Sequence, residues 1–426
     1  MMSRAIWRLV LLISCAHALV HVFELALPST EQLIVDDYPQ RDAVQLGARR
    51  LPSTEQLITD DYDVGKVTTG WLSAAWRLPW GLGALVAGLL VDRYGSRRML
   101  AIYLLVCGAC CAAVAARLPL PALFVVMAVM GAGASIYHPA GLALISHETS
   151  AVDRPRALGL HGIFGSLGIG CAPLIAALVL DRGMTWRQYY AVLAVPGVLL
   201  GMAFAYVAWR HGGERATLSA ALKPRSDTPT DDAETADWRS FFTLTLLALM
   251  QGIVYSAVLS FLTRYLSGWR PDWLAESNQS FQRYTTSFVL IVGCVGQYLA
   301  GRFGRADRLE RQLTLVTLAN APLLVWMAFA VGQQRMLAAA AFAIVHFMHQ
   351  PLYNSLIAKY TPRRRRSLCY GFSFAMGLGV GSVGALWAGY SPSDTITYLA
   401  TAGVAVLAAC IGGVLCVFHR KESQLV

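Results

Sequence analysis

Long apolar runs alternate along this chain with short stretches rich in charges, prolines and glycines. A helix needs about 20 mainly apolar residues to cross the hydrocarbon core of a bilayer. Runs of that length predict twelve spans, at 5–27, 67–91, 99–118, 121–147, 157–180, 189–209, 241–265, 284–301, 312–333, 336–359, 369–390 and 395–418. The pattern therefore predicts an all-α integral membrane protein with 12 transmembrane helices.

The most polar connection, 210–240, divides the predicted spans into six and six. We expect a cytoplasmic linker there, between an N-terminal half (1–209) and a C-terminal half (241–426). A repeat relates the halves, since Pro139 matches Pro351 and Gly159 matches Gly371 at one constant separation. Two pseudo-symmetric six-helix bundles are a transporter architecture.

A second, local repeat lies in the first outer loop. Residues 27–38 return at 51–62 with a single change, at Thr59. Nothing in the composition of the duplicated segment 27–62 requires a function, so we expect a tolerated insertion.

Composition and charge narrow the class of protein. Hydrophobic residues make up 56% and charged residues 14% of the chain, whereas ordinary soluble proteins carry about 25% charged residues. The net charge of +10 does not predict nucleic-acid binding, because no long hydrophilic domain is present to display a basic face. We interpret the charge as a topology signal. It predicts cytoplasmic termini, since Lys and Arg are about twice as frequent in the loops on that side.

The remaining composition gives further expectations. The nine cysteines lie in or beside apolar runs without zinc-site spacing, so we predict no metal site. No P-loop sequence is present, so we predict no nucleotide and no cofactor. The basic run 363–366 is expected to anchor topology and to contact anionic lipid. We expect a monomer in a bacterial inner membrane.

A basic loop between the second and third spans, GLLVDRYGSRRM at 88–99, has distinctive chemistry. Gly88 permits two helices to approach closely, and Gly95 permits a tight turn. Asp92 is suited to accept a hydrogen bond from a helix N-terminus or an arginine. The residues predicted to form a conformational gating loop are Gly88, Asp92, Arg93, Gly95, Arg97 and Arg98.

This loop resembles the signature of the major facilitator superfamily, and a degraded second copy, GRFGR, follows at 301–305. The resemblance extends to Trp186-Arg187 and to glycines at 159, 162, 165, 168 and 170. It covers nearly the whole chain. The stretch 137–141 is weakly similar to the fosmidomycin-resistance-like branch. Span 4 lacks the embedded arginine found in many proton-coupled members. The resemblance implies transport of a small solute by alternating access, with spans 1, 4, 7 and 10 lining a central cavity.

Polar residues inside the predicted spans concentrate in those four spans, and in Arg77 of span 2. Because ionisable groups in lipid are costly, we expect them to face an interior or a wet space. The predicted substrate and proton pathway comprises His17, His21, Glu24, Arg77, Tyr137, His138, Gln251, Tyr255, His346, His349, Gln350, Tyr353 and Asn354. Each histidine taken singly is as consistent with a packing role, and the shallower His161 is expected to be structural.

Depth along the helices places Glu24 and Arg77 at one level, so we predict that they interact. The pair is either a functional link that a proton or an anion breaks, or a fixed brace between two spans. The histidines titrate near neutral pH when unperturbed and are candidates to carry a coupling proton.

The sequence therefore predicts a proton-coupled secondary transporter of a small organic solute. The alternative is a membrane-embedded sensor that keeps the fold without turnover. An enzyme is not expected, because the histidines lack an H-E-x-x-H arrangement.

Overall fold

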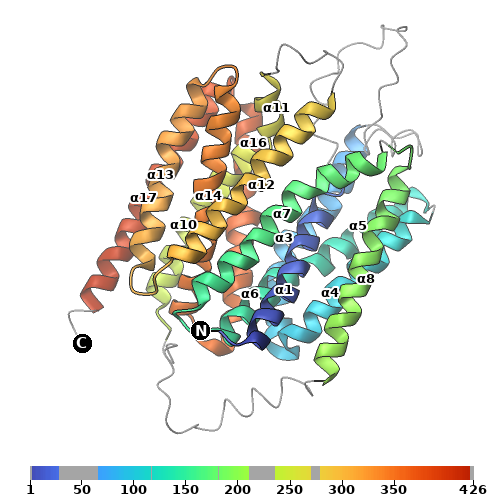
Figure 1. Ribbon diagram of the computed structural model, residues 1–426, viewed down its shortest axis with the longest axis horizontal. Coiled ribbons are helices and arrows are strands. Elements are labelled where there is room, and N and C mark those ends of the chain that lie inside the picture. Colours follow the sequence, from blue (N-terminus) through green and yellow to red (C-terminus); the bar gives the residue numbers. More distant parts are fainter. Residues whose placement is uncertain are drawn as a thin grey trace.

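The computed structural model describes residues 2–27, 66–116, 118–180, 182–210, 236–269 and 279–422. Within these ranges the chain forms helices and no strands. The two halves lie side by side, with the N-terminal half in blue to green and the C-terminal half in yellow to red (Figure 1). Nearly all of the duplicated segment and most of the predicted linker lie outside the described residues.

The helices follow the predicted spans closely. The N-terminal half contains α1 (Arg4–Glu24), α3 (Lys66–Tyr94), α4 (Ser96–Ala115), α5 (Leu120–Ala134), α6 (Tyr137–Glu148), α7 (Arg154–Leu180) and α8 (Trp186–Arg210). The C-terminal half contains α10 (Trp238–Leu259), α11 (Leu262–Ser267), α12 (Gln279–Phe303), α13 (Leu309–Phe329), α14 (Gln334–Tyr360), α15 (Arg366–Phe374), α16 (Val383–Tyr390) and α17 (Asp394–Glu422).

Eleven spans among the described residues are long and apolar enough to cross a membrane, with α5 and α6 together forming one. Helix α3 occupies the remaining predicted span. The start of α1 and the end of α17 lie at one end of the bundle, where α8 ends and α10 begins (Figure 1). We call this the linker end, and it is the end predicted to be cytoplasmic.

One predicted span is less regular than the sequence suggested. Instead of a uniform helix over 369–390, α15 continues as a π-helix at Ala375–Gly379 and a 3-10 turn at Val380–Ser382 before α16. Glycines explain the irregularity, because Gly377 and Gly381 pack their backbone directly on Gly252 of α10. We call residues 375–382 the irregular segment.

The glycine series of α7 has two faces. Gly165 lies against the His17 ring and Gly168 against the Ala18 carbonyl, so this face receives α1. Gly159, Gly162 and Gly170 lie against Gly301, Gln297 and Ile291 of α12. These glycines therefore let α7 lie close to α1 of its own half on one side and to α12 of the other half on the other.

We expect Gly168→Ala to destabilise the N-terminal half, because the added methyl group would overlap the backbone of Ala18. Overpacking of this kind costs about 1–3 kcal/mol, and the unfolding temperature in detergent should fall. The matched control is Gly403→Ala in α17, where an added methyl meets nothing within 4 Å. Equal unfolding temperatures for the two variants would contradict this close α1–α7 packing.

Candidate functional site

A cavity of about 330 Å³ lies between the two halves. Its charged lining groups, Glu24 and Arg77, both come from the N-terminal half. The C-terminal half contributes hydroxyl groups to the wall, from Tyr255, Ser256, Ser260, Thr286 and Ser382. The cavity volume falls at the lower end of the range for small-molecule sites, which is about 300–1,000 Å³.

The course of α1 shows where the cavity lies in the bundle. Helix α1 starts at the linker end, and its last residue, Glu24, lines the cavity. The cavity therefore lies in the half of the bundle away from the linker end. At the linker end the halves are in contact. Gly159 meets Gly301, while His147 donates to the Arg363 carbonyl at 3.1 Å and Arg363 to the His147 carbonyl at 3.0 Å.

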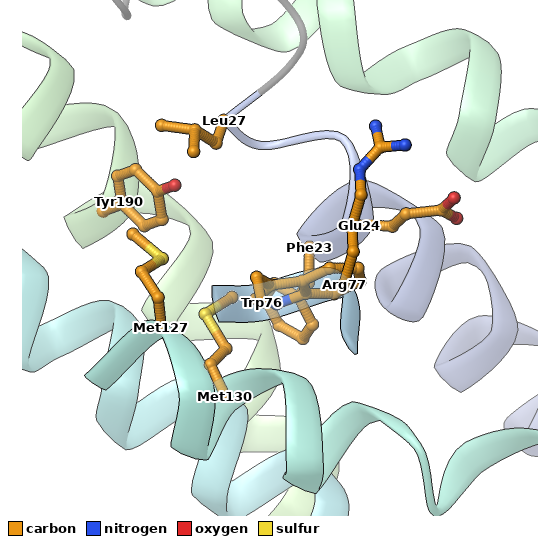
Figure 2. A pocket seen from close by; sticks show the side chains of 8 residues that line it. All are labelled: Phe23, Glu24, Leu27, Trp76, Arg77, Met127, Met130 and Tyr190. Carbon is orange, nitrogen blue, oxygen red and sulfur yellow. The ribbon is translucent and has the colours of Figure 1, made fainter. Parts of the chain in front are cut away.

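A second, smaller recess of about 10 Å³ adjoins this cavity and shares Glu24 and Arg77 with it. Figure 2 shows these two side chains beside Phe23, Trp76, Met127, Met130 and Tyr190, with the guanidinium and the carboxylate pointing in different directions. The recess has space for about one water molecule. Arg77 and Glu24 therefore stand where water reaches them.

The predicted contact between Glu24 and Arg77 is not formed in this conformation. A Glu24 carboxylate oxygen lies 2.6 Å from Nδ1 of His21, three residues earlier on the same helix. No ion pair joins Glu24 to Arg77 among the described residues. The intrahelical partner is nearer, and the long Arg77 side chain is exposed.

Glu24 is the end of a hydrogen-bonded chain of histidines. Nδ1 of His17 donates to the carbonyl oxygen of His161 at 2.8 Å, and Nε2 of His17 lies 3.2 Å from Nε2 of His21. The His21–Glu24 contact completes the chain. The His161 carbonyl is only an acceptor, which assigns a proton to Nδ1 of His17.

The hydrogen bonds determine how many protons the chain holds. Three hydrogen bonds need three protons, wherever each one sits along its bond. Two neutral imidazoles and an ionised carboxylate supply only two. If all three contacts are hydrogen bonds, the His17–His21–Glu24 chain holds one proton more than these two supply, and its net charge is zero.

The sequence analysis treated His161 as structural, but the fold places it in this cluster. Its ring stacks on His17 at 4.0 Å between centroids, and its Nδ1 lies 3.3 Å from the Tyr137 hydroxyl. The missed signal was the glycine series of α7, because Gly165 and Gly168, one to two turns after His161, bring α7 close to α1.

Helix α6 contributes two of the predicted residues. Tyr137 stacks on His17 at 5.1 Å and donates to the Ile13 carbonyl at 3.0 Å. His138 stacks at 4.2 Å on Phe374, which belongs to the other half. The histidine cluster therefore touches the interface between the halves.

The predicted residues of the C-terminal half lie mostly behind the cavity wall. Tyr255 lines the cavity and stacks on His346 at 6.0 Å. The other members of the α14 stripe make helix contacts: His349 donates to the His346 carbonyl, and Gln350 accepts from Gln297. Tyr353 lies near the His349 ring, and the Asn354 carbonyl accepts from Tyr370. Gln251 is 1% exposed, and its amide group has no hydrogen-bond partner among the described residues.

The gating loop has the expected local geometry. A methyl group on Gly88 would lie 2.8 Å from the Leu368 Cα at the start of α15, and Gly95 has a φ of 91°. A carboxylate oxygen of Asp92 accepts from the Leu368 backbone N–H at 3.2 Å. The loop therefore joins the two halves at a helix N-terminus, where a carboxylate is favourable.

The arginines of the loop have different partners. Arg97 forms an ion pair with Glu148 at the end of α6 at 2.5 Å. The Arg93 guanidinium lies over the Tyr94 ring, and Arg98 is exposed. Arg97 thus holds the loop to its own half, while Asp92 holds it to the other.

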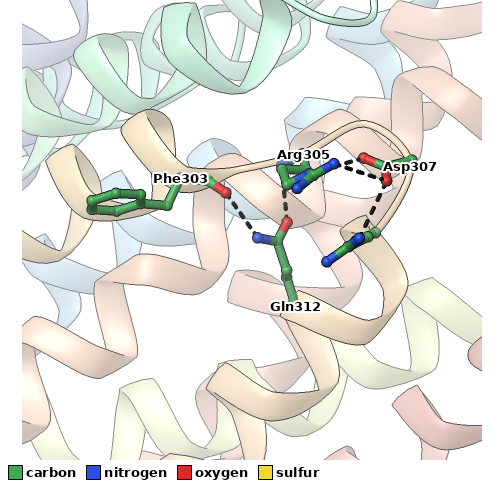
Figure 3. Close-up of polar contacts among 5 residues, drawn as sticks. Phe303, Arg305, Asp307 and Gln312 are labelled. Atoms are coloured by element: carbon green, nitrogen blue, oxygen red, sulfur yellow. Dashed lines mark hydrogen bonds and ion pairs between the residues drawn. The ribbon is translucent and has the colours of Figure 1, made fainter.

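The second, degraded copy of the loop is shown in Figure 3. Gln312 accepts from the Arg305 backbone N–H at 2.9 Å and donates to the Phe303 carbonyl at 2.8 Å. Asp307 pairs with Arg305 and Arg308, each at 3.3 Å. Desolvation by itself raises the pKa of Asp307. The backbone N–H of Asp307 and these two guanidinium groups outweigh it, so the pKa is lowered. The contacts shown here are within one half.

We expect Asp92→Ala to loosen the first turn of α15, because it removes the carboxylate that accepts from Leu368. Loss of a helix-capping oxygen costs about 1 kcal/mol, which corresponds to roughly five-fold faster amide exchange in that turn. Hydrogen–deuterium exchange of residues 366–374 measures this.

The matched control is Asp307→Ala, which removes the aspartate of the second loop and leaves the contact with α15 intact. Exchange in α15 that is unchanged by Asp92→Ala, or equally raised by Asp307→Ala, would show that Asp92 does not connect the halves.

The sequence model of the Major Facilitator Superfamily matches residues 51–386. The chain belongs to this superfamily. It is a multispanning membrane transporter and not an enzyme.

Individual relatives are more distant. A probable L-galactonate transporter of Escherichia coli (strain K12) is 28% identical over 215 residues, which cover 48% of this chain and 45% of that protein. The match thus spans about half the length of the relative.

Solved structures are similar over almost the whole chain. The human organic anion transporter MFSD10 (TETRAN) superposes with a TM-score of 0.69 at 16% identity, covering 96% of this chain and 100% of that one. The proton:xylose symporter XylE gives 0.69 at 13% identity, with 95% and 94% coverage. FucP in its outward conformation gives 0.62 at 14% identity, with 95% and 98% coverage. At these identities the likeness concerns the fold.

Proposed function

We propose that this chain is a proton-coupled secondary transporter of a small hydroxylated organic acid, of the sugar-acid class. The observation that carries the proposal is the cavity between the halves, which combines one guanidinium, one carboxylate and a wall of hydroxyl groups. The partial match to a probable L-galactonate transporter supports the solute class. The fold of two proteins described as proton symporters is in keeping with the coupling.

Recognition of the solute follows from the chemistry of the wall. Arg77 presents a planar fork of donors that matches a carboxylate, and charged pairs of this kind are the stronger hydrogen bonds. Tyr255, Ser256 and Ser260 of α10 lie across the cavity and are suited to the hydroxyl groups of the same solute. An anion with several hydroxyls therefore meets complementary groups on both halves.

Coupling follows from the proton count of the His17–His21–Glu24 chain. With the additional proton present, Glu24 is held by His21, and Arg77 is available to an anionic solute. Loss of that proton breaks one hydrogen bond and leaves a net negative charge, and the nearest cation in the cavity is Arg77. Glu24 then competes with the solute carboxylate for Arg77. Proton and anion binding favour each other, as linkage requires for symport.

Alternating access uses the contacts at the linker end. The halves are joined there through Asp92 and Leu368, and through His147 and Arg363. Opening this end requires those bonds to break while the cavity closes at the opposite end. The irregular segment forms part of the cavity wall. A π-helical turn of the kind that it contains is often found at functional sites.

Orientation and assembly are part of the proposal. The basic residues Arg363–Arg365 lie exposed at the linker end, where the positive-inside rule places the cytoplasm. They are suited to contact anionic lipid headgroups. We propose a monomer in a bacterial inner membrane with both termini cytoplasmic, acting on a small molecule and on protons and not on nucleic acid.

We expect Glu24→Gln to abolish accumulation of a sugar acid against its gradient and to leave exchange partly intact, because the variant cannot release the coupling proton. Proteoliposomes with an imposed pH gradient and labelled L-galactonate measure both activities. The matched control is Asp307→Asn, an exposed acid in the second loop. Equal loss of both activities in correctly inserted protein would identify Glu24 as a structural brace.

We expect Arg77→Gln to weaken binding of sugar acids by about 10- to 100-fold, the value of a hydrogen bond to a charged group of about 1.5–3 kcal/mol. Binding of the corresponding uncharged sugar should change little. Thermal-shift titration in detergent measures both. Arg182→Gln is the control, since Arg182 bonds the Leu178 carbonyl within its own segment.

Equal weakening of charged and uncharged ligands would contradict the carboxylate role of Arg77. A protein that binds sugar acids yet moves none under any gradient would favour the membrane-embedded sensor. Failure to bind any sugar acid would exclude the proposed solute class.

A further inference from the structure

Three histidines of the N-terminal half bring their ring nitrogens together. One nitrogen from each of His17, His21 and His138 lies within 4.8 Å of the other two. All three are buried, with residue exposures of 3%, 5% and 7%. His17 and His21 are four residues apart on α1, the spacing at which two helical histidines share one metal ion. The sequence analysis expected no metal site because neither the cysteines nor the histidines show a metal-binding spacing, and the third histidine, on α6, is far along the chain.

One of the three nitrogen–nitrogen distances already fits a tetrahedral ion. Two imidazole nitrogens at about 2.0–2.1 Å from a tetrahedral ion are about 3.3–3.4 Å apart, and Nε2 of His17 and Nε2 of His21 are separated by 3.2 Å. Nε2 of His138 is buried and has no hydrogen-bond partner among the described residues. The His138 nitrogen needs to approach the other two by at most about 1.5 Å to complete the set.

The ring orientations also fit. The His17 and His21 planes are inclined by 53°, those of His21 and His138 by 63°, and those of His17 and His138 by 89°. Three rings directed at one point can have such inclinations, which also occur in edge-to-face ring packing. His17 and His161 are stacked instead, with planes inclined by 7°.

Second partners orient two of the three ligands. Nδ1 of His17 donates to the His161 carbonyl, and Nδ1 of His21 faces the Glu24 carboxylate. Metal-bound histidines almost always donate their other nitrogen to a carbonyl or a carboxylate, which fixes the ring and increases its basicity. Here both arrangements are present, and both point Nε2 toward the cluster.

We propose that His17, His21 and His138 form a binding site for one divalent transition-metal ion of the zinc class. Three imidazoles without oxygen ligands favour zinc, cobalt, nickel or copper over magnesium and calcium. The fourth position is left for water or an exogenous ligand. The site requires neither the proposed solute nor the proposed coupling.

The site has a route to the cavity. Glu24 bonds His21 and lines the cavity, and Trp80, whose ring is 6.3 Å from that of His138, also lines it. The ion therefore binds directly behind the cavity wall. Because all three ligands belong to one half, the site does not depend on the relative position of the halves.

Metal binding changes the proton count in a defined way. An ion bound to both Nε2 atoms replaces the proton that these atoms share, while the protons on Nδ1 of His17 and between His21 and Glu24 remain. One proton is released for each ion bound. The other titratable side chains around the cluster are Tyr103 of α4, Tyr137 of α6 and His161 of α7.

The test is a titration with Co²⁺. The full chain is purified in detergent and carries no polyhistidine tag. We expect one ion per chain with the intense visible absorption of tetrahedral cobalt, and release of about one proton per ion in weakly buffered solution. His138→Gln should lower the affinity at least ten-fold and abolish the tetrahedral spectrum.

The matched control is His346→Gln, which changes a histidine of the other half that is 1% exposed and leaves the three ligands intact. Its cobalt spectrum and affinity should equal those of the unmodified chain. If His138→Gln unfolds, Glu24→Gln replaces it, since loss of a second partner lowers metal affinity by about 10- to 100-fold.

Three results would overturn the proposal. These are absence of saturable cobalt binding, the weak spectrum of six-coordinate cobalt, or unchanged affinity in the folded His138→Gln or Glu24→Gln variant.

Discussion

The high cost of an ionisable side chain inside a membrane-spanning bundle governs the organisation of this protein. Several such groups in the described part of the N-terminal half have a polar partner or line a cavity, whereas Nε2 of the buried His138 has no hydrogen-bond partner there. His17 and His21 are bonded in a chain that ends at Glu24, and Arg77 lies in the wall of a wet cavity. Glu24 and Arg77 therefore lie where the halves face each other, and in the proposed mechanism they serve as the end of a proton store and as an anion-binding cation.

Close backbone contact is the second constraint. Without a hydrophobic force between helices in lipid, packing depends on small residues that let backbones approach. The two glycine faces of α7 receive α1 on one side and α12 on the other, so a single helix connects the histidine chain with the other half. At the linker end, Gly88 permits the same approach between α3 and α15. Glycine contacts of this kind are compatible with the alternating access proposed for the bundle.

Much of the fold was predictable from local signals. Apolar run lengths gave the spans within a few residues, because the thickness of the bilayer sets the length of each helix. The local geometry of the loop at 88–98 was also predictable, since a positive φ at Gly95 and a carboxylate acceptor at Asp92 are properties of single residues. Its gating role stays a prediction. The pairing of Glu24 was predicted incorrectly for this conformation. Helical depth placed it level with Arg77, but depth alone does not give direction, and His21 is the nearer partner.

The sequence by itself determined which helices exist, how they are grouped into halves and which of them carry buried charge, because these depend on hydrophobicity and on spacing along one helix. Only the tertiary structure decided which polar groups meet. His161 and His138 join His17 through contacts between α1, α6 and α7, and the α14 histidines lie behind the wall instead of on it. The physical reason is that rotation of each helix about its own axis is set by its neighbours, through glycine contacts more than a hundred residues apart in the chain.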